Sequence, residues 1–197
     1  MSDPETIKVY DARAEEYAQM SSEENFADPR LETFITSMPT EARVLDIGCG
    51  PGQAAARMAQ AGLRVEATDA SAEMAERANK LDGVTAWQAT FDEITGTAIY
   101  DGIWANFCLL HAPRTDMPRH LAALRTALKP DGIFHIGMKL GTGEARDSIG
   151  RLYTYYSQDE LTNLLTEANL VVTDAATGRT KGLDGTMADW VTLAAHA

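Results

Sequence analysis

Residues 44–52 read VLDIGCGPG, and this stretch decides the fold. An apolar run ends at an acidic residue, passes into glycines at positions 48, 50 and 52, and leads into good helix formers over 53–61. The pattern predicts a strand, a tight loop and a helix. Glycines permit positive φ angles and lack the Cβ atoms that keep a ligand away from the backbone. We therefore expect the loop amides and the start of the helix to face a bound group.

The residues around the loop indicate which group it binds. A dinucleotide fingerprint, G-x-G-x-x-G, would need a third glycine at position 53, where this chain has glutamine, and it stabilises an anionic pyrophosphate. Asp46 would repel that anion, but it suits an ammonium such as the α-amino group of a methionine moiety. A second strand expected over 63–68 ends at Asp69, where a carboxylate can accept both hydroxyls of a ribose. These features describe a nucleoside joined to an amino acid without a phosphate.

At this point the chain resembles the class I S-adenosylmethionine-dependent methyltransferases. The resemblance is strongest over residues 43–138 and weak at the two ends. It implies S-adenosyl-L-methionine as the cofactor and a small molecule as the methyl acceptor. The features that carry it, in the family's usual order and spacing, are residues 44–52, Asp69, residues 90–92 (TFD), residues 100–106 (YDGIWAN) and residues 128–132 (LKPDG).

Strands and helices are expected to alternate along the chain, which predicts an α/β fold with a mostly parallel sheet and helices on both faces. The resemblance implies a Rossmann-like sheet of seven strands in the order 3-2-1-4-5-7-6, with the last strand antiparallel. A turn-rich segment over 176–186 is expected to separate the last two strands. The expected strands are 43–47, 63–68, 84–88, 99–106, 132–138, 170–174 and 190–194; the main helices are 53–61, 72–80, 114–128 and 158–168.

The length and composition favour one domain. A chain of 197 residues, 45% of them hydrophobic, can bury about 70% of its unfolded surface in one core. We expect a single domain over 1–197, without a repeat or a long linker. Its parts would be an N-terminal helical cap (1–38), a cofactor-binding core (43–138), a substrate loop (139–156) and a segment that completes the sheet (157–197).

The charge and the cysteine count exclude several classes of protein. A formal net charge of −12 argues against nucleic acid as a partner, because phosphate binding needs clustered Lys and Arg. The two cysteines are too few for a disulfide scaffold and lack metal-ligand spacing, so we expect reduced thiols in a cytoplasmic protein. No apolar run approaches the ~18 residues of a membrane span. A monomer or a homodimer is expected.

The first helix carries two tyrosines. Apolar and aromatic positions recur at helical spacing from Ile7 to Met20. The segment over 10–17 resembles the leading helix of many small-molecule methyltransferases, which lies over the cofactor. The resemblance places Tyr17 near the reactive end of the cofactor and Tyr10 near the substrate. Alternatively, both tyrosines only anchor the helix.

Polar residues at the strand ends are expected to converge on one crevice, because ligands of such sheets bind beyond the carboxyl ends of the strands. In the family, residues 90–92 flank the adenine, with an acidic side chain near the exocyclic amine and an apolar one against the ring. Asp92 could instead cap a short helix. The predicted cofactor-binding residues are Tyr17, Asp46, Gly48, Gly50, Asp69, Ala70, Thr90, Phe91, Asp92 and Asn106.

Methyl transfer from a sulfonium is an in-line displacement from an already activated group. The protein mainly has to hold the acceptor in line and exclude water, effects that supply ~7 to 11 kcal/mol. A general base is needed only for acceptors such as a hydroxyl or a protonated amine. His111, a few residues after the fourth strand, is the predicted base, because its unperturbed pKa lies near neutrality. The alternative is a histidine that bonds to backbone or lines the pocket. The sequence shows no spacing that predicts a metal site.

Substrate choice is expected to depend on the two segments least like the common core, the N-terminal helices and residues 139–156. The latter segment is basic and aromatic, which suits a carboxylate or phosphate on a planar or small substrate. It could equally be a solvated loop with packed tyrosines. The predicted substrate-binding residues are Tyr10, His111, Lys139, Arg146, Tyr153 and Tyr155; Arg151 and Tyr156 lie in the same loop.

Two other classes of function remain open at this stage. An NAD-type oxidoreductase shares the strand, glycine loop and helix, although Gln53 and Asp46 count against it. A non-catalytic S-adenosylmethionine-binding protein would keep the same motifs, because a fold does not prove a function.

Overall fold

A seven-stranded sheet forms the centre of the protein, whose computed structural model describes residues 3–25 and 28–197. The strand order is β3-β2-β1-β4-β5-β9-β8, with parallel pairs from β3 to β5, while β9 is antiparallel to β5 and β8. Because β6 and β7 form a separate hairpin, this is the expected order 3-2-1-4-5-7-6, and the predicted fold class is confirmed. The strands are β1 (Arg43–Ile47), β2 (Arg64–Asp69), β3 (Val84–Gln88), β4 (Tyr100–Asn106), β5 (Leu128–Lys139), β8 (Val171–Lys181) and β9 (Met187–His196).

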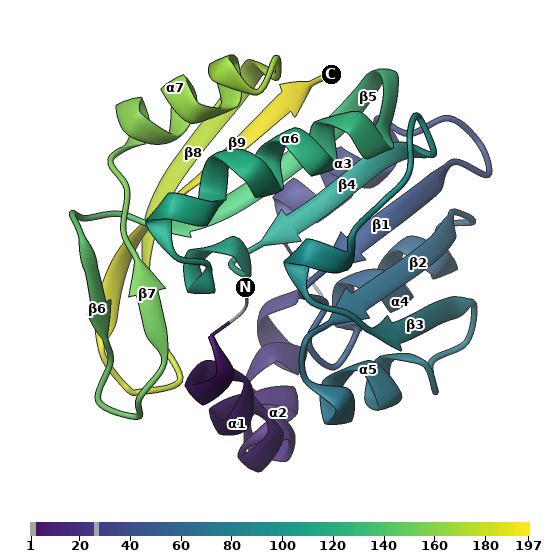
Figure 1. The fold of residues 1–197 in the computed structure, drawn as a ribbon. Coiled ribbons are helices and arrows are strands. Elements are labelled where there is room, and N and C mark those ends of the chain that lie inside the picture. The colour runs from purple at the N-terminus through teal and green to yellow at the C-terminus, as the bar shows by residue number, and fades with distance from the viewer. Residues whose placement is uncertain (1–2, 26–27) are drawn as a thin grey trace.

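Helices cover both faces of the sheet. Helices α6 (Met117–Ala127) and α7 (Gln158–Glu167) lie on one face, and α3 (Pro29–Thr36), α4 (Gln53–Gln60) and α5 (Ala72–Ala78) lie on the other (Figure 1). Successive residues of one strand therefore enter different cores: Leu45 belongs to the core under α6 and α7, and Val44 to the core under α3 and α4. Burial on both faces explains the continuous apolar runs of these strands. Short 3-10 helices span Phe91–Glu93, Leu109–His111 and Arg114–Asp116.

Two N-terminal helices lie beyond the carboxyl ends of the parallel strands (Figure 1). The sequence predicted one helix to Met20, but the chain forms α1 (Pro4–Ala12) and α2 (Ala14–Asn25), with Arg13 between them at φ −120° and ψ 21°. The break places the rings of Tyr10 and Tyr17 edge to face, with centroids 5.4 Å apart. The cap thus presents both tyrosines to the end of the sheet.

The C-terminal half contains one hairpin that the sequence did not predict and one that is longer than predicted. Residues 139–156 include the antiparallel strands β6 (Glu144–Arg146) and β7 (Leu152–Thr154). The turn-rich segment predicted over 176–186 is wrong for residues 176–181, because β8 continues to Lys181 and pairs with β9 as far as Met187, and the turn is confined to residues 182–186. The polar and small residues over 176–181 lie on an edge strand, where one side is open to solvent and tolerates them. The turn between β8 and β9 consequently lies close to the end of β5.

No helix in the described ranges, 3–25 and 28–197, is long and apolar enough to span a bilayer.

Candidate active site

Two adjoining cavities lie at the carboxyl edge of the sheet. The larger holds about 350 Å³ and the smaller about 70 Å³. The smaller cavity reaches Asp69 and Phe91, whereas the larger reaches Asp46, Lys139 and the turn between β8 and β9. The residues that line both are Tyr10, Tyr17, Gly48, Asn106 and Phe107. A single elongated ligand can therefore occupy both.

The glycine loop follows β1 and has the conformation that its sequence requires. Gly48 has φ +63° and Gly50 has φ +54°, angles that side chains rarely adopt. A Cβ atom at Gly48 would lie 2.2 Å from Cβ of Cys108, and one at Gly50 would lie 3.2 Å from the ring of Tyr17. Glycine at these two positions thus lets the loop pass directly beneath the cap and beside the cavities.

Asp69 joins the end of β2 to this loop. Its Oδ2 accepts a hydrogen bond from the Gly50 amide at 2.9 Å, and its Oδ1 accepts one from the Ser71 amide at 2.8 Å. Burial raises the pKa of Asp69 to about 6, although these amides favour the charged form. Each carboxylate oxygen keeps a further lone pair, so the side chain can still accept hydrogen bonds from a ligand in the smaller cavity.

Asp46 is a buried carboxylate, 3% exposed, on the wall of the larger cavity. Its Oδ2 has no hydrogen-bond partner in the described part of the chain. Burial and the nearby Asp69 raise the pKa of Asp46 to about 8. A buried carboxylate with an unpartnered oxygen is stabilised in its charged form by a cation beside it. The site is thus suited to a ligand ammonium, as the sequence predicts.

The smaller cavity has an apolar wall. Ala70, Met74 and Phe91 line it, and the ring of Phe91 packs edge to face on that of His120 at 5.6 Å. Thr90 and Asp92 line neither cavity. Thr90 is the N-cap of the short helix that begins at Phe91. Capping a short helix was the alternative role that the sequence predicted for Asp92. Asp92 is exposed and forms an ion pair with Arg119 of α6.

Asn106 at the end of β4 is positioned by the neighbouring strand. A Cβ atom at Gly137 of β5 would lie 2.5 Å from Oδ1 of Asn106, so glycine there leaves room for the amide. The next residue, Phe107, has φ +55° and donates its amide to the Gly137 carbonyl at 3.0 Å. Both side chains thereby line the two cavities.

His111 is buried in a polar chain that determines its tautomer. Its Nδ1 lies 2.6 Å from the Leu152 carbonyl, which can only accept, so Nδ1 carries the proton. Its Nε2 then accepts from the hydroxyl of Tyr10 at 2.8 Å, and that hydroxyl accepts from Nη1 of Arg151 at 3.0 Å. Burial lowers the pKa of His111 to about 3. The geometry favours a positioning role for His111, and its role as a base stays a prediction.

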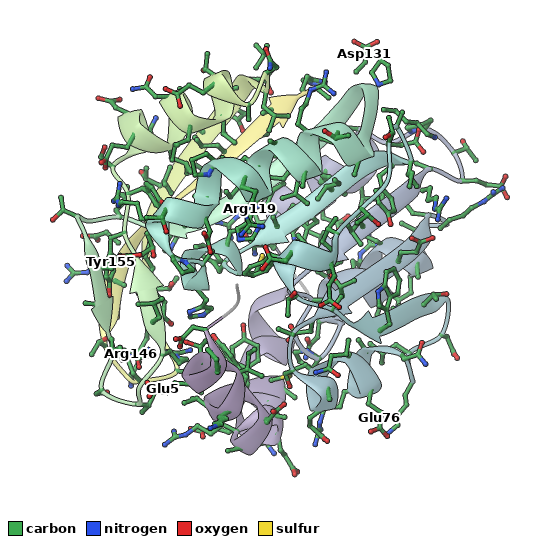
Figure 2. The ribbon with its side chains drawn as sticks, viewed as in Figure 1. Glu5, Glu76, Arg119, Asp131, Arg146 and Tyr155 are labelled. Carbon is green, nitrogen blue, oxygen red and sulfur yellow. The ribbon has the colours of Figure 1, made fainter. Side chains whose placement is uncertain are left out.

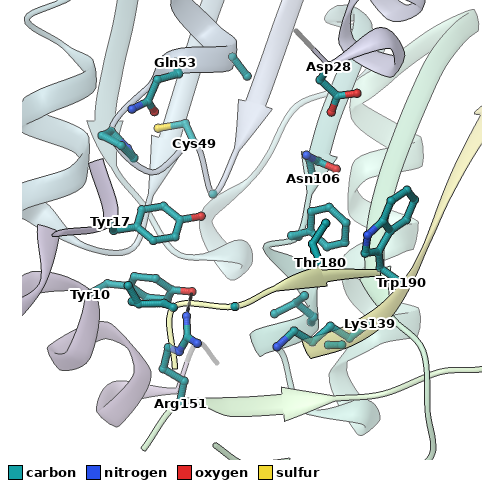
Figure 3. A pocket seen from close by; sticks show the side chains of 18 of the residues that line it. Tyr10, Tyr17, Asp28, Cys49, Gln53, Asn106, Lys139, Arg151, Thr180 and Trp190 are labelled. Carbon is teal, nitrogen blue, oxygen red and sulfur yellow. Dashed lines mark hydrogen bonds between the residues drawn. The ribbon is translucent and has the colours of Figure 1, made fainter. Parts of the chain in front are cut away.

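Opposite the glycine loop, the larger cavity has a cationic and aromatic wall. Figure 3 shows Cys49 and Gln53 on one side, Lys139 and Arg151 on the other, and the side chains of Tyr17 and Lys139 pointing into the space between. The sequence predicted Lys139 and Tyr153 for this wall but missed several lining residues: Arg30, Trp104, Thr180, Lys181 and Trp190. They come from segments that sequence reasoning treated as structural, and no local motif marks them.

Two predicted substrate residues lie outside both cavities. Arg146 extends from β6 toward α1, where it pairs with Asp3 at 2.9 Å and with Glu5 at 3.1 Å (Figure 2). Tyr155 follows β7 and lines neither cavity. Their roles in substrate binding stay predictions.

Comparison with known proteins establishes the family. A family model described as a methyltransferase domain matches residues 16–175, so the chain belongs to the methyltransferase-domain family. The predicted class of enzyme and its cofactor, S-adenosylmethionine, are confirmed at this level. Membership also argues against the dinucleotide-dependent oxidoreductase. A search of curated proteins found no match.

Solved structures share the fold. The 1,6-didemethyltoxoflavin-N1-methyltransferase of Burkholderia thailandensis, with bound 1,6-didemethyltoxoflavin and S-adenosylhomocysteine, has a TM-score of 0.72 and 24% identity. The match covers 100% of this chain and 91% of that one. An S-adenosylmethionine-dependent methyltransferase of Mesorhizobium loti has a TM-score of 0.69 and 18% identity, over 86% and 96% of the two chains.

One similar structure is named for a different reaction. The [4+2]-cyclase SpnF has a TM-score of 0.67 and 17% identity, and the match covers 84% of this chain and 81% of that one. At these identities each likeness shows the fold alone. The acceptor and the roles of individual residues therefore have to be argued from the site itself.

Proposed function

We propose that this protein transfers the methyl group of S-adenosylmethionine to a small-molecule acceptor bound in the larger cavity. The observation that carries the proposal is the pair of carboxylates, Asp46 and Asp69, beside one glycine loop and two adjoining cavities. When bound, S-adenosylmethionine supplies an activated methyl group on a sulfonium, from which an acceptor displaces the thioether in line.

The residues present fit this cofactor. The buried, unpartnered Oδ2 of Asp46 would receive the ammonium of its methionine moiety. Asp69 would accept hydrogen bonds from the ribose, and Phe91 and Ala70 would line the adenine side. Gly48 and Gly50 remove the side chains that would fill the space between these groups. Tyr17 and Asn106 line both cavities and would contact the cofactor where the two join.

The size and walls of the larger cavity support a small acceptor. The cap tyrosines and the turn between β8 and β9 line a space of about 350 Å³. The net charge of −12 disfavours a polyanion such as a nucleic acid. The fold's similarity to a methyltransferase with bound 1,6-didemethyltoxoflavin is in keeping with an acceptor of that size. Both cysteines are free thiols, which supports a cytoplasmic site of action.

Binding and turnover test the proposal separately. Calorimetry should detect S-adenosylhomocysteine binding to the protein and no binding of NAD. A metabolite screen that follows release of S-adenosylhomocysteine should then identify an acceptor. Tight binding of NAD, or no binding of S-adenosylhomocysteine, would contradict the assignment of the cofactor. Binding of S-adenosylhomocysteine without turnover of any metabolite would favour the non-catalytic alternative.

A further inference from the structure

We infer that the acceptor is a planar organic anion and that Lys139 binds its anionic group. This inference rests on the proposed function, because it assigns the space that the cofactor leaves in the larger cavity. It goes further by naming the chemical class of the acceptor and the residue that selects it.

Lys139 is a half-buried cation without a counter-ion. It is the last residue of β5, opposite Trp190 of β9, and its side chain points into the larger cavity (Figure 3). Its Nζ lies 3.8 Å from the ring centroid of Tyr153 and makes no hydrogen bond or ion pair with any residue that the structure describes. A contact with an aromatic face only partly replaces lost hydration, so the ammonium is available to an anion.

Two neighbouring cations, Arg151 and Arg30, have carboxylate partners, and Lys181, which also lines the cavity, is exposed. Nη2 of Arg151 lies 2.7 Å from Oδ2 of Asp147, and Nε of Arg30 lies 2.7 Å from Oδ1 of Asp28. These carboxylates offset both guanidinium charges. Nη1 of Arg30 still has no hydrogen-bond partner among the described residues and can add a hydrogen bond to an anion that reaches Lys139.

The carboxylates near Lys139 are themselves occupied. Asp147 holds Arg151, and Asp184 accepts hydrogen bonds from the amide and hydroxyl of Thr186. Although both favour the charged ammonium, burial and Arg151 lower the pKa of Lys139. An anion in the cavity would reverse that effect, because it would supply the missing counter-charge.

The cavity walls fit a flat ligand. Phe107, Tyr153 and Trp190 line the cavity, whereas the ring of Trp104 is buried between His135 and Phe34. Phe107 meets Trp190 edge to face at 6.2 Å. Aromatic walls of this kind bind planar rings through offset-stacked or edge-to-face contacts. A ring between them, with its anion at Lys139, would direct its opposite edge toward the glycine loop.

The position of Lys139 sets the orientation of the acceptor. Lys139 and the glycine loop lie on opposite sides of the larger cavity (Figure 3), so an anionic group held by Lys139 turns the rest of the ring toward the glycine loop. The rival assignment is that Lys139 pairs with the carboxylate of the cofactor. The two assignments differ in which ligand loses affinity when the ammonium is removed.

Calorimetry on the full chain saturated with S-adenosylhomocysteine tests the inference. The probes are benzoate, phenyl phosphate and neutral benzamide, so that the first two separate a carboxylate from a phosphate. At least one anion should bind the wild type about 10-fold or more tightly than benzamide. In Lys139→Met that preference should disappear, whereas Lys139→Arg should keep it within about three-fold. Lys8→Met, an exposed charge loss on α1 outside both cavities, should match the wild type.

Three results would overturn the inference: benzamide binding as tightly as both anions, no binding of either anion, or Lys139→Met weakening S-adenosylhomocysteine but not the anion. Failure of the proposed function has a different signature, because the wild type would then not bind S-adenosylhomocysteine at all. Anion binding to the protein without the nucleoside still tests Lys139 in that case. Thermal unfolding of each variant shows that the substituted chains are folded.

Discussion

The two ends of the joined cavities differ in charge and in how the chain builds them. The acidic end consists of β1, the glycine loop and the tip of β2, all within residues 43–71. The cationic and aromatic end combines residues from α3, β4, β5, β7, β8 and β9. The acidic end would bind a cofactor common to the family, and the other end an acceptor particular to this chain. If the proposed ligands are correct, a local motif binds the ligand that the family shares, and segments distant in sequence bind the ligand particular to this chain.

The largest expected effect is the loss of the acidic end in Asp69→Ala. The substitution removes the acceptor of two amide hydrogen bonds and the proposed partner of the ribose. Since hydrogen bonds to a charged group contribute ~1.5–3 kcal/mol each, the affinity for S-adenosylhomocysteine should fall by at least about 100-fold. Calorimetry measures this affinity. The control is Asp174→Ala, which removes an exposed carboxylate of β8. Wild-type affinity in Asp69→Ala would end the ribose assignment.

Asp46→Asn, also at the acidic end, should raise the stability of the protein without ligand and weaken the binding of S-adenosylhomocysteine. In the native protein Asp46 has a pKa of about 8, above its unfolded value, so its contribution to stability is lost as the pH rises from 4 toward 8. An amide carries no charge, so the variant without ligand should be more stable than the wild type at pH 8, by an amount on the order of a few kcal/mol. S-adenosylhomocysteine should bind about 10-fold more weakly.

Urea unfolding at pH 5 and pH 8 measures the first effect of Asp46→Asn, and calorimetry measures the second. The stability difference between variant and wild type should grow with pH. A variant that is less stable at pH 8, with unchanged affinity, would show that Asp46 is a structural residue and not the ammonium partner.

These two residues also show what the sequence made predictable. The apolar run, the three glycines and the two carboxylates lie within one strand, loop and strand, so their joint position follows from local structure. The sheet order came from the family resemblance. By contrast, Trp190 and Lys181 reach the cavity only because β8 and β9 form a long hairpin, and the polar residues over 176–186 indicated a turn. Arg30 likewise joins the site only through tertiary packing of α3.

The hydrogen-bonded chain of His111, Tyr10 and Arg151 should make the stability of the protein depend on pH. Burial keeps His111 neutral in the native protein, with a pKa of about 3, whereas the unfolded chain binds a proton below its ordinary value of about 6.5. His111 therefore stabilises the fold above pH 6.5, and this contribution is lost as the pH falls toward 3. His111→Gln should reduce the slope of stability against pH by up to about 1.4 kcal/mol per unit below pH 6.

Urea unfolding of wild type and His111→Gln between pH 5 and 6.5 measures this change in slope. Tyr10→Phe is the matched control, because it removes the hydroxyl that donates to His111 and leaves a titratable imidazole. An equal slope in His111→Gln and wild type would mean that His111 is protonated in the native state. His111→Gln also tests whether His111 is the general base. If it is, the pH profile of turnover in the wild type shows the ionisation of His111, and that ionisation is absent from the profile of the variant.

Arg146→Ala should have the smallest effect, although the sequence placed this residue with Lys139 in the substrate loop. Arg146 is exposed and its guanidinium pairs with Asp3, the N-cap of α1, and with Glu5 of α1, so it joins the β6–β7 hairpin to the cap and lines neither cavity. Ion pairs of an exposed side chain contribute little, because solvent screens the charge of Arg146 in the folded and unfolded states. Anion and S-adenosylhomocysteine affinities should both stay within about two-fold of wild type. If calorimetry instead finds that anion affinity falls as far as in Lys139→Met, the cationic wall extends outward to β6, and the acceptor is larger than the cavity between Lys139 and the glycine loop.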